Sequence, residues 1–265
     1  AGIADAKSEI FQGIVPGGVA VLPRDDDFFD RLAAAAAARG VNRIVTFGRH
    51  PDSDIRLEDA QLHATCSAVT AAIKGHARPL EFCLALPGGH WVINALGVLA
   101  VVKALGLDLV TAAAEFARLV AMKGRGARQR LELPGGGGAI LIDDSYNANP
   151  DSVLAALGVL AAAPGRRTLV LGDLAELGHG VQELHRQLGL RATEYGIDRL
   201  MTVGEHSGQA GVAFEGEHPH YAGDTALVDE LMVGLSEEDS ILVKGSRSAH
   251  MERVVERLRQ GDVAC

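Results

Sequence analysis

The sequence has no surplus of positive charge. Its 265 residues include 25 Lys and Arg against 34 Asp and Glu, so the formal net charge is −9. A general nucleic-acid-binding protein needs basic groups that displace counterions from the phosphates. We therefore expect no nucleic-acid partner.

Long hydrophobic runs and paired cysteines are also absent. The longest apolar runs, near Val92–Val102 and Val153–Ala163, fall well short of the roughly 20 residues that a membrane-spanning helix needs. Charged residues interrupt the first ten positions, so no signal peptide is predicted. The three cysteines have no spacing typical of a metal or redox pair, and such a sparse set is typical of reduced thiols. We expect a cytoplasmic protein that does not insert into a membrane.

Aromatic residues are scarce as well, at 4%, although 48% of the residues are hydrophobic. The core must therefore consist mainly of Ala, Val, Leu and Ile, which suits helices packed closely on a sheet. The length is typical of one large or two medium domains. The chain starts at Ala1 rather than Met and enters a helical pattern at once, so we expect a piece of something longer.

In the second half of the chain, apolar strand-like runs alternate with helical patterns. The predicted strands are Ala139–Asp143, Thr168–Gly172, Arg199–Val203 and Ser240–Lys244. The predicted helices are Asp151–Ala163, Val181–Tyr195, a short one from Ser207, Thr225–Leu235 and Ala249–Leu258. This alternation predicts parallel βαβ units and an α/β, doubly wound, mostly parallel sheet.

The first half is more mixed. Helices are predicted over Ala4–Ile14, Phe28–Arg39, Trp91–Leu105 and Leu109–Met122, and strands over Gly18–Leu22, Val41–Gly48 and parts of Asp54–Leu86. The glycine-rich stretch 123–126 is a natural hinge between the halves. We therefore predict two domains, residues 1–125 and 126–265.

Three polar clusters follow predicted strands directly, at residues 143–149, 172–178 and 244–247. In doubly wound sheets, ligands bind beyond the carboxyl ends of the strands. The first cluster has two carboxylates, which can accept hydrogen bonds from ribose hydroxyls, before a helix start, which favours anions. The competing interpretation is a capped turn in which Asn149 and Asp144 satisfy backbone donors.

These clusters also carry a family resemblance. The strings DDSYNANP (143–150), GDLAELG (172–178) and VKGSRSAHME (243–252) resemble the Mur ligases. Residues 4–11 and 86–96 fit the central domain of that family. The resemblance implies the last part of an α/β central ATP-binding domain followed by a Rossmann-like C-terminal domain.

The resemblance implies an ATP-dependent amide ligase, with Mg²⁺, that acts in peptidoglycan precursor synthesis. The KGSR and DSYNANP strings favour the branch that joins D-alanyl-D-alanine to UDP-N-acetylmuramoyl-tripeptide through an acyl phosphate. We also expect a monomer. The family's phosphate loop, of the form GKT or GKS, does not occur in the sequence. The glycines Gly135–Gly138 lack the required Lys and Ser/Thr and predict a hairpin turn instead. We therefore expect this chain alone to be inactive.

The resemblance assigns nucleotide-binding roles to five residues. Asn94 would read the adenine edge, because an amide offers both a donor and an acceptor. Arg125 would reach the nucleotide phosphate or ribose, since its planar fork grips phosphate. Asp144 would bind the ribose, and Tyr146 and Asn147 would line the nucleotide side of the cleft.

The other assignments concern metal, dipeptide and transferred phosphate. Lys7 matches a lysine that is carbamylated in the family and helps to hold magnesium. Asp173 and Glu176 would orient the ammonium group of the dipeptide, or cap the following loop. The predicted catalytic residues, assigned to the dipeptide carboxylate and the acyl-phosphate region, are Lys244, Ser246 and Arg247.

Two other functions remain open. One is another ligase of the same superfamily, such as a folylpolyglutamate synthase or the diaminopimelate-adding ligase. The latter usually carries an Asn-Pro-Arg type motif where this chain has KGSR and DSYNANP. The other is a non-catalytic nucleotide-binding module derived from a ligase, which the missing phosphate loop favours.

Overall fold

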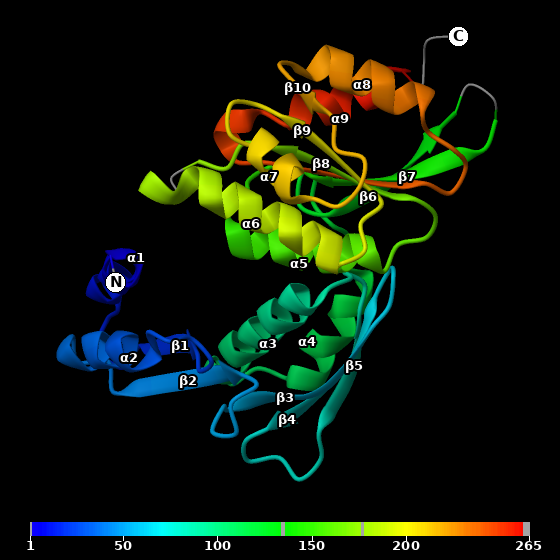
Figure 1. Cartoon of the computed structure of the whole chain (residues 1–265). Coiled ribbons are helices and arrows are strands. Elements are labelled where there is room, and N and C mark those ends of the chain that lie inside the picture. The colour runs from blue at the N-terminus through cyan, green and yellow to red at the C-terminus, as the bar shows by residue number, and fades with distance from the viewer. Residues whose placement is uncertain (1, 134–135, 176–177, 262–265) are drawn as a thin grey trace. The chain divides into compact units, whose positions relative to one another are not determined.

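The chain forms two compact units, residues 1–119 and 120–265, and the turn at residues 123–126 lies near the start of the second unit. The computed structural model describes residues 2–133, 136–175 and 178–261 (Figure 1). The division falls before the boundary predicted at 125/126, because the turn is bonded to the second unit. The backbone N–H groups of Gly124 and Gly126 donate to the Asp143 carboxylate and carbonyl, over 3.1 and 2.8 Å.

The first unit is built on a five-stranded sheet of order β1–β2–β3–β4–β5. The pairs β1–β2 and β2–β3 are parallel, and β3–β4 and β4–β5 are antiparallel. Its elements are α1 (Gly2–Ser8), the 3-10 turn η1 (Glu9–Gly13), β1 (Val19–Pro23), α2 (Phe29–Ala38), β2 (Arg43–Gly48), β3 (Ile55–Leu62), β4 (Ser67–Ile73), β5 (Leu80–Leu84), α3 (Gly89–Ala104), α4 (Leu109–Glu115) and η2 (Phe116–Arg118).

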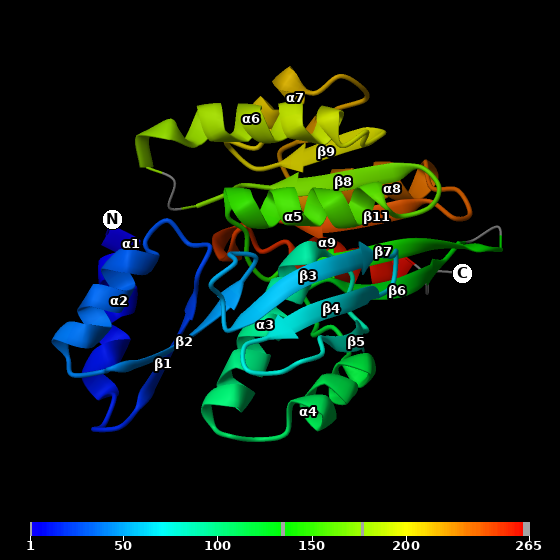
Figure 2. The same ribbon diagram turned by 90° about the horizontal axis from the view of Figure 1, so that it is seen from below.

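Helix α3 packs along β1 to β4 and covers one face of this sheet (Figure 2). In β4 the residues Val69, Ala71 and Ile73 are buried on that face, and the residues between them are more exposed. The ring of Phe47 in β2 lies against Gly97 of α3, where a larger side chain would crowd it. Strands β3, β4 and β5 form the antiparallel part of the sheet, and the residues on their opposite face are more exposed.

Two predicted helices are shorter in the structure. The helix predicted over Ala4–Ile14 ends at Ser8, where the 3-10 turn η1 begins. The prediction for Leu109–Met122 is wrong beyond Glu115, where α4 ends and the 3-10 turn η2 begins. The carbonyl of Phe116 accepts a hydrogen bond from the N–H of Ala85, just beyond β5, over 3.1 Å. Leu119 then adopts an extended conformation. A contact with a distant segment therefore ends the helix, and local sequence does not encode it.

The second unit contains a six-stranded sheet of order β10–β9–β8–β11–β7–β6, in which only the pairing of β6 with β7 is antiparallel. This confirms the predicted doubly wound, mostly parallel sheet. The elements are β6 (Ala127–Glu132), β7 (Gly138–Asp144), α5 (Pro150–Ala161), β8 (Arg167–Gly172), η3 (Gly178–Gly180), α6 (Val181–Glu194), β9 (Arg199–Val203), α7 (Gly208–Ala213), β10 (His220–Tyr221), α8 (Asp224–Val233), β11 (Ser240–Lys244), η4 (Arg247–Ala249) and α9 (Glu252–Gly261).

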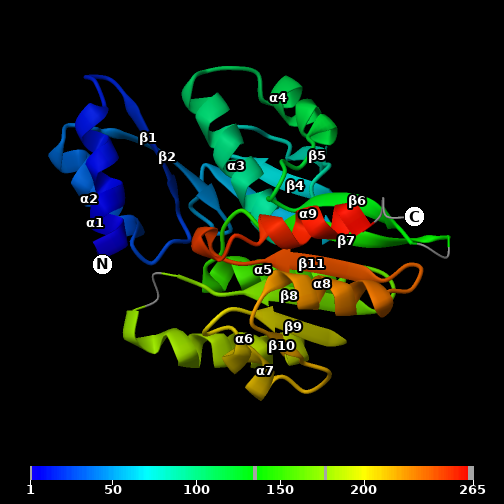
Figure 3. The same ribbon diagram turned by 90° about the horizontal axis from the view of Figure 1, so that it is seen from above.

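Helices cover both faces of this second sheet. Helices α5, α6 and α7 share one hydrophobic core with residues such as Leu242 of β11, and α8 and α9 share another with its neighbours Ile241 and Val243 (Figure 3). Adjacent residues of a buried strand point to opposite faces, so the apolar residues of the central strands enter one core or the other. In the central strands β7, β8 and β11, this double cover leaves chiefly the strand ends accessible, and the carboxyl ends carry the polar clusters.

The turn after β7 is fixed by the start of α5. Asn149 is the N-cap, as the capped-turn interpretation expects: its side chain accepts from the N–H of Ser152 over 2.8 Å, and the Ser152 hydroxyl accepts from the N–H of Asn149 over 2.9 Å. Pro150 occupies the first turn, where no donor is needed. Within the described residues, no helix is long and apolar enough to cross a bilayer.

Candidate functional site

The carboxyl ends of β7 and β11 lie side by side, with Lys244 paired in register with Asp144. The Lys244 ammonium lies 2.6 Å from Asp144 Oδ2 and donates to the Asn147 carbonyl over 3.1 Å. The Lys244 side chain is only 2% exposed, and that of Asp144 is 23% exposed. The ion pair therefore joins two strand ends that are 100 residues apart in the sequence, and its carboxylate is the more accessible partner.

The electrostatics of Asp144 result from opposing effects. Burial raises the pKa of its carboxyl, the Lys244 ammonium and its hydrogen bond lower it, and the neighbouring Asp143 raises it again. The net pKa lies above the ordinary value for aspartate. Lys244 thus stabilises the charged form of Asp144 at a position where burial disfavours that form.

Asp143 points into the protein and organises the turn, a role that the sequence analysis did not assign. Its buried carboxylate accepts from the N–H of Gly124 over 3.1 Å and from the Ser145 hydroxyl over 2.6 Å. Arg259 of α9 lies 3.8 Å away. Strand alternation is the signal that could have found it, because adjacent residues of β7 must face opposite sides.

Tyr146 provides an exposed aromatic surface next to this ion pair. Tyr146 is 46% exposed. The Arg125 guanidinium lies 4.3 Å from the ring centroid, and that of Arg247 lies 5.5 Å from it. The N–H of Arg247 also donates to the Asn147 side chain over 3.2 Å. Two guanidinium groups next to one exposed aromatic ring can bind a ligand that is planar or anionic.

Asp173 follows β8 and supports the site through its backbone. The N–H and hydroxyl of Ser246 donate to the Asp173 carbonyl over 3.0 and 2.7 Å. Its carboxylate accepts from the N–H groups of Glu205, His206 and Ser207 over 2.7 to 3.0 Å. Burial raises the pKa of this carboxyl, but these hydrogen bonds outweigh burial and bring it below its ordinary value. Of the two predicted roles, the contacts support loop capping.

The second unit therefore brings together most of the residues predicted for the site, namely Arg125, Asp144, Tyr146, Asn147, Asp173, Lys244, Ser246 and Arg247. Lys244 and Ser246 are almost wholly buried, whereas the Arg247 side chain is 60% exposed and pairs with Glu252. Burial places the first two behind the surface of the site rather than on it. Glu176 lies outside the described residues.

Two predicted residues belong to the first unit. Asn94 is exposed in the second turn of α3, and Lys7 is exposed on α1. Among the residues that the structure describes, no cluster of three His, Cys, Asp or Glu could hold a metal ion.

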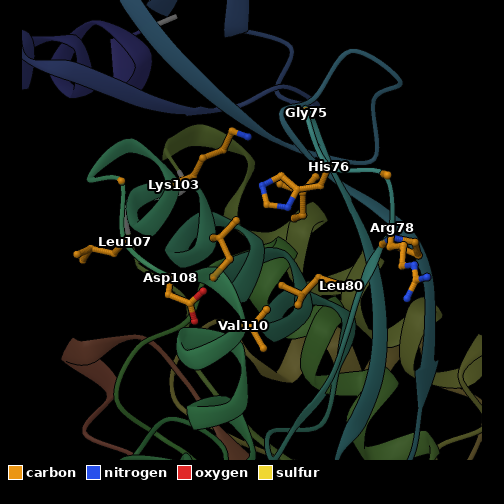
Figure 4. A pocket seen from close by; sticks show the side chains of 13 residues that line it. Gly75, His76, Arg78, Leu80, Lys103, Leu107, Asp108 and Val110 are labelled. Atoms are coloured by element: carbon orange, nitrogen blue, oxygen red, sulfur yellow. The ribbon is translucent and has the colours of Figure 1, made fainter.

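A pocket of about 660 Å³ in the first unit lies elsewhere. It is lined by the β4–β5 turn with His76 and Arg78, by Lys103 at the end of α3 and by Asp108 in the loop before α4 (Figure 4). Lys103 donates to the Lys74 carbonyl over 2.6 Å, and Asp108 caps α4. None of the predicted site residues lines this pocket.

Two family models match the chain. The Mur ligase middle domain matches residues 1–102, and the glutamate ligase domain of Mur ligases matches residues 129–247. The chain belongs to the Mur ligase family. The resemblance carried by the three motif strings is thereby confirmed, and each Mur ligase domain model falls within one of the two structural units.

Individual Mur ligases are similar over nearly the whole chain. The UDP-N-acetylmuramoyl-tripeptide–D-alanyl-D-alanine ligase of Escherichia coli is 36% identical over 262 residues, 98% of this chain and 56% of that protein. The Bacillus subtilis enzyme of the same name is 29% identical over 264 residues, 97% of this chain and 54% of that protein. The chain thus spans about half the length of the curated relatives that it matches.

Solved Mur ligase structures agree with this fold. The structure of MurF from Acinetobacter baumannii superposes with a TM-score of 0.85 at 29% identity, over 98% of this chain and 55% of that one. MurF from Thermotoga maritima, solved in complex with ADP, gives a TM-score of 0.79 at 22% identity, over 98% and 57%. These similarities confirm the α/β fold class.

Proposed function

We propose that this chain is the acceptor-domain part, with a portion of the central ATP-binding domain, of a ligase that joins D-alanyl-D-alanine to UDP-N-acetylmuramoyl-tripeptide. The observation that carries the proposal is the 36% identity to the Escherichia coli ligase of that name over 98% of the chain. We also propose that the protein is cytoplasmic and monomeric. Light scattering after gel filtration tests the monomeric state.

The accessible residues at the ends of β7 and β11 suit the binding of a nucleotide. The Asp144 carboxylate can accept hydrogen bonds from ribose hydroxyls, and Lys244 holds it in place. The exposed Tyr146 ring offers a stacking surface, and the Arg125 and Arg247 guanidinium groups over it offer charge to phosphates. Asn147 fixes the backbone of Arg247 through its side chain. The adenine-reading role of Asn94 remains part of this proposal.

Two of the three predicted catalytic residues are buried, and this changes the roles that we assign to them. We assign Lys244 and Ser246 as positioning residues, because one holds Asp144 and the other holds the backbone of Asp173. Arg247 is exposed, so it is the member of the group that can reach a carboxylate or the charge that develops on a transferred phosphate. Asp173 positions the loop that follows β9, through its three backbone bonds.

ATP would supply the phosphate that activates the tripeptide carboxylate, which the dipeptide amine then attacks. The chain's own contribution is to hold and orient ligands, which such chemistry chiefly requires. Mg²⁺ would be held in part by Lys7 if that side chain is carbamylated, as the family resemblance implies, and would supply positive charge beside the phosphates.

Amide-bond formation tests the proposal in the natural protein in which this chain occurs. With ATP, UDP-N-acetylmuramoyl-tripeptide and D-alanyl-D-alanine, we expect ADP and phosphate to appear in equal amounts with the ligated product. Product from meso-diaminopimelate or from glutamate instead would favour another ligase of the superfamily. ATP binding without any amide product would favour a non-catalytic nucleotide-binding module.

A matched pair of variants then tests the site. Tyr146→Ala removes the ring beneath both guanidinium groups, and Tyr146→Phe keeps it. We expect the alanine variant to raise the KM for ATP about tenfold, the equivalent of 1.4 kcal/mol, and the phenylalanine variant to change it little. Equal KM values in all three proteins would remove this ring from the nucleotide site.

A further inference from the structure

Two of the three cysteines lie on the outer face of the antiparallel part of the first unit. Cys83 in β5 is exposed and pairs in register with Ala68 of β4. Cys66 immediately precedes β4, two residues before Ala68. Since alternate residues of a strand point to the same face, Cys66 and Cys83 are diagonal neighbours across adjacent strands.

The two thiols also interact with each other. Partial burial, then the charge of Cys66 and a side-chain hydrogen bond with it, raise the pKa of the Cys83 thiol. Both sulfurs are free thiols, and Cys66 is half-buried. Their separation in the sequence shows no redox motif, so only the strand register reveals the pair.

We propose that Cys66 and Cys83 form a redox-active dithiol that closes to an intramolecular disulfide on reaction with a low-molecular-weight disulfide. The pairing of β4 with β5 holds the two residues next to each other before oxidation. This function is separate from ligation, since neither cysteine belongs to the proposed nucleotide or acceptor site.

The reaction consists of two thiol–disulfide exchanges. The Cys66 thiolate attacks one sulfur of the small disulfide, forms a mixed disulfide and releases one small thiolate. The Cys83 thiolate then attacks the Cys66 sulfur, forms the protein disulfide and releases the second small thiolate. The two protons lost by the protein are taken up by the two released thiolates. Two protein thiols are oxidised, and one small disulfide is reduced to two thiols.

The open sheet face beside the cysteine pair admits a small reagent and selects it by charge. Cys83 lines a pocket of about 370 Å³ on the open sheet face, together with Asp59, Thr70 and Glu81. Asp59 pairs with Thr70, and Thr70 with Glu81, so two carboxylates lie in the row next to Cys83. They repel an anionic disulfide such as oxidised glutathione and leave access to an uncharged one.

Formation of the disulfide would link the edge strand β5 covalently to the start of β4. Strand β5 is at one edge of the sheet and leads into α3, which carries Asn94. The disulfide would enclose residues 66–83 in a covalent loop and restrict the unfolded chain. We expect the oxidised protein to show a higher Tm for the unfolding of the first unit than the reduced protein.

Peptide mapping tests the pair directly. The protein carries Cys265→Ser, is fully reduced, and is then treated with the uncharged reagent bis(2-hydroxyethyl) disulfide. Trypsin separates the two cysteines, because Leu57–Lys74 contains Cys66, and Gly75–Lys103 contains Cys83 with the Arg78–Pro79 bond resistant. We expect a disulfide-linked pair of these peptides, a loss of about 2 Da from the intact chain, and full reversal by dithiothreitol.

The variant Cys83→Ser is the control, and in it Cys66 should stop at the mixed disulfide. The proposal is overturned if the oxidised two-cysteine protein carries two separate mixed disulfides. It is also overturned if both thiols stay reduced while a free cysteine peptide in the same tube reacts completely, or if the linked peptides come only from dimers of the chain.

Discussion

Substituting Lys244 tests the ion pair at the ends of β7 and β11 through protein stability. The variant Lys244→Met keeps the volume and the apolar stem of the side chain but removes the ammonium group. Asp144 would then be a largely buried carboxylate with no cation in contact and with Asp143 beside it. Removing one partner of a buried pair costs about 3–5 kcal/mol. We expect about 3 kcal/mol, because Asp144 is still in partial contact with water.

The loss should depend on pH. Lys244 lowers the pKa of Asp144, so its removal raises that pKa further above the ordinary value. A carboxyl whose pKa is higher in the folded than in the unfolded state favours folding when it is protonated and loses that contribution as pH rises through the folded pKa. Lys244→Met should therefore be least destabilising in acid and most destabilising at neutral pH. The double variant Lys244→Met/Asp144→Asn has no unpaired charge and should be more stable at neutral pH than Lys244→Met alone.

Urea unfolding measures these differences. All three tyrosines lie in residues 120–265, so near-ultraviolet circular dichroism in the tyrosine band follows the second unit. The single tryptophan, Trp91, lies in the first unit, and its fluorescence provides the reference. A loss below about 1 kcal/mol at neutral pH would refute the inferred ion pair, as would a loss that is the same in acid.

Three other substitutions test the packing around the site. The variant Asp173→Asn replaces a carboxylate that accepts from three backbone N–H groups, and we expect it to lower the free energy of unfolding in urea by about 1–2 kcal/mol. Because the pKa of the Asp173 carboxyl is lowered in the folded protein, the difference in stability from wild type should disappear as the pH falls through that pKa. Gly189→Ala places a methyl group against the Ala210 carbonyl between α6 and α7, so we expect a lower Tm and a cost of about 1–3 kcal/mol; an unchanged Tm would contradict that close approach. Asn149→Ala removes the cap of α5 and should cost about 1 kcal/mol, which Asn149→Ser should largely restore.

Much of the fold follows from local sequence. The strands Arg199–Val203 and Ser240–Lys244 have the predicted bounds, because short buried apolar runs between polar segments identify them. The two-residue edge strand β10 has no periodicity and was not predicted. The end of α4 depends on the distant Ala85, and such tertiary contacts override local helix preference.

The candidate site, like the fold, could be predicted from the sequence only in part. The rule on strand ends predicted that Asp144 and Lys244 would converge, since both follow parallel strands. Their direct contact depends on β11 lying next to β7, a sheet order that sequence periodicity does not reveal. The two roles predicted for Asp173 stayed open for the same reason, because its partners lie more than thirty residues further along the chain.

Nucleotide binding at the ends of β7 and β11 is the central claim, and an NMR titration of the ¹⁵N-labelled chain with ADP tests it most directly. We predict that the largest shifts occur in the backbone amides of residues 145–148 and 246–248 and in the side-chain Nε–H of Arg125. Signals that stay unmoved there at saturating ADP, or shifts confined to other surfaces, would contradict the claim.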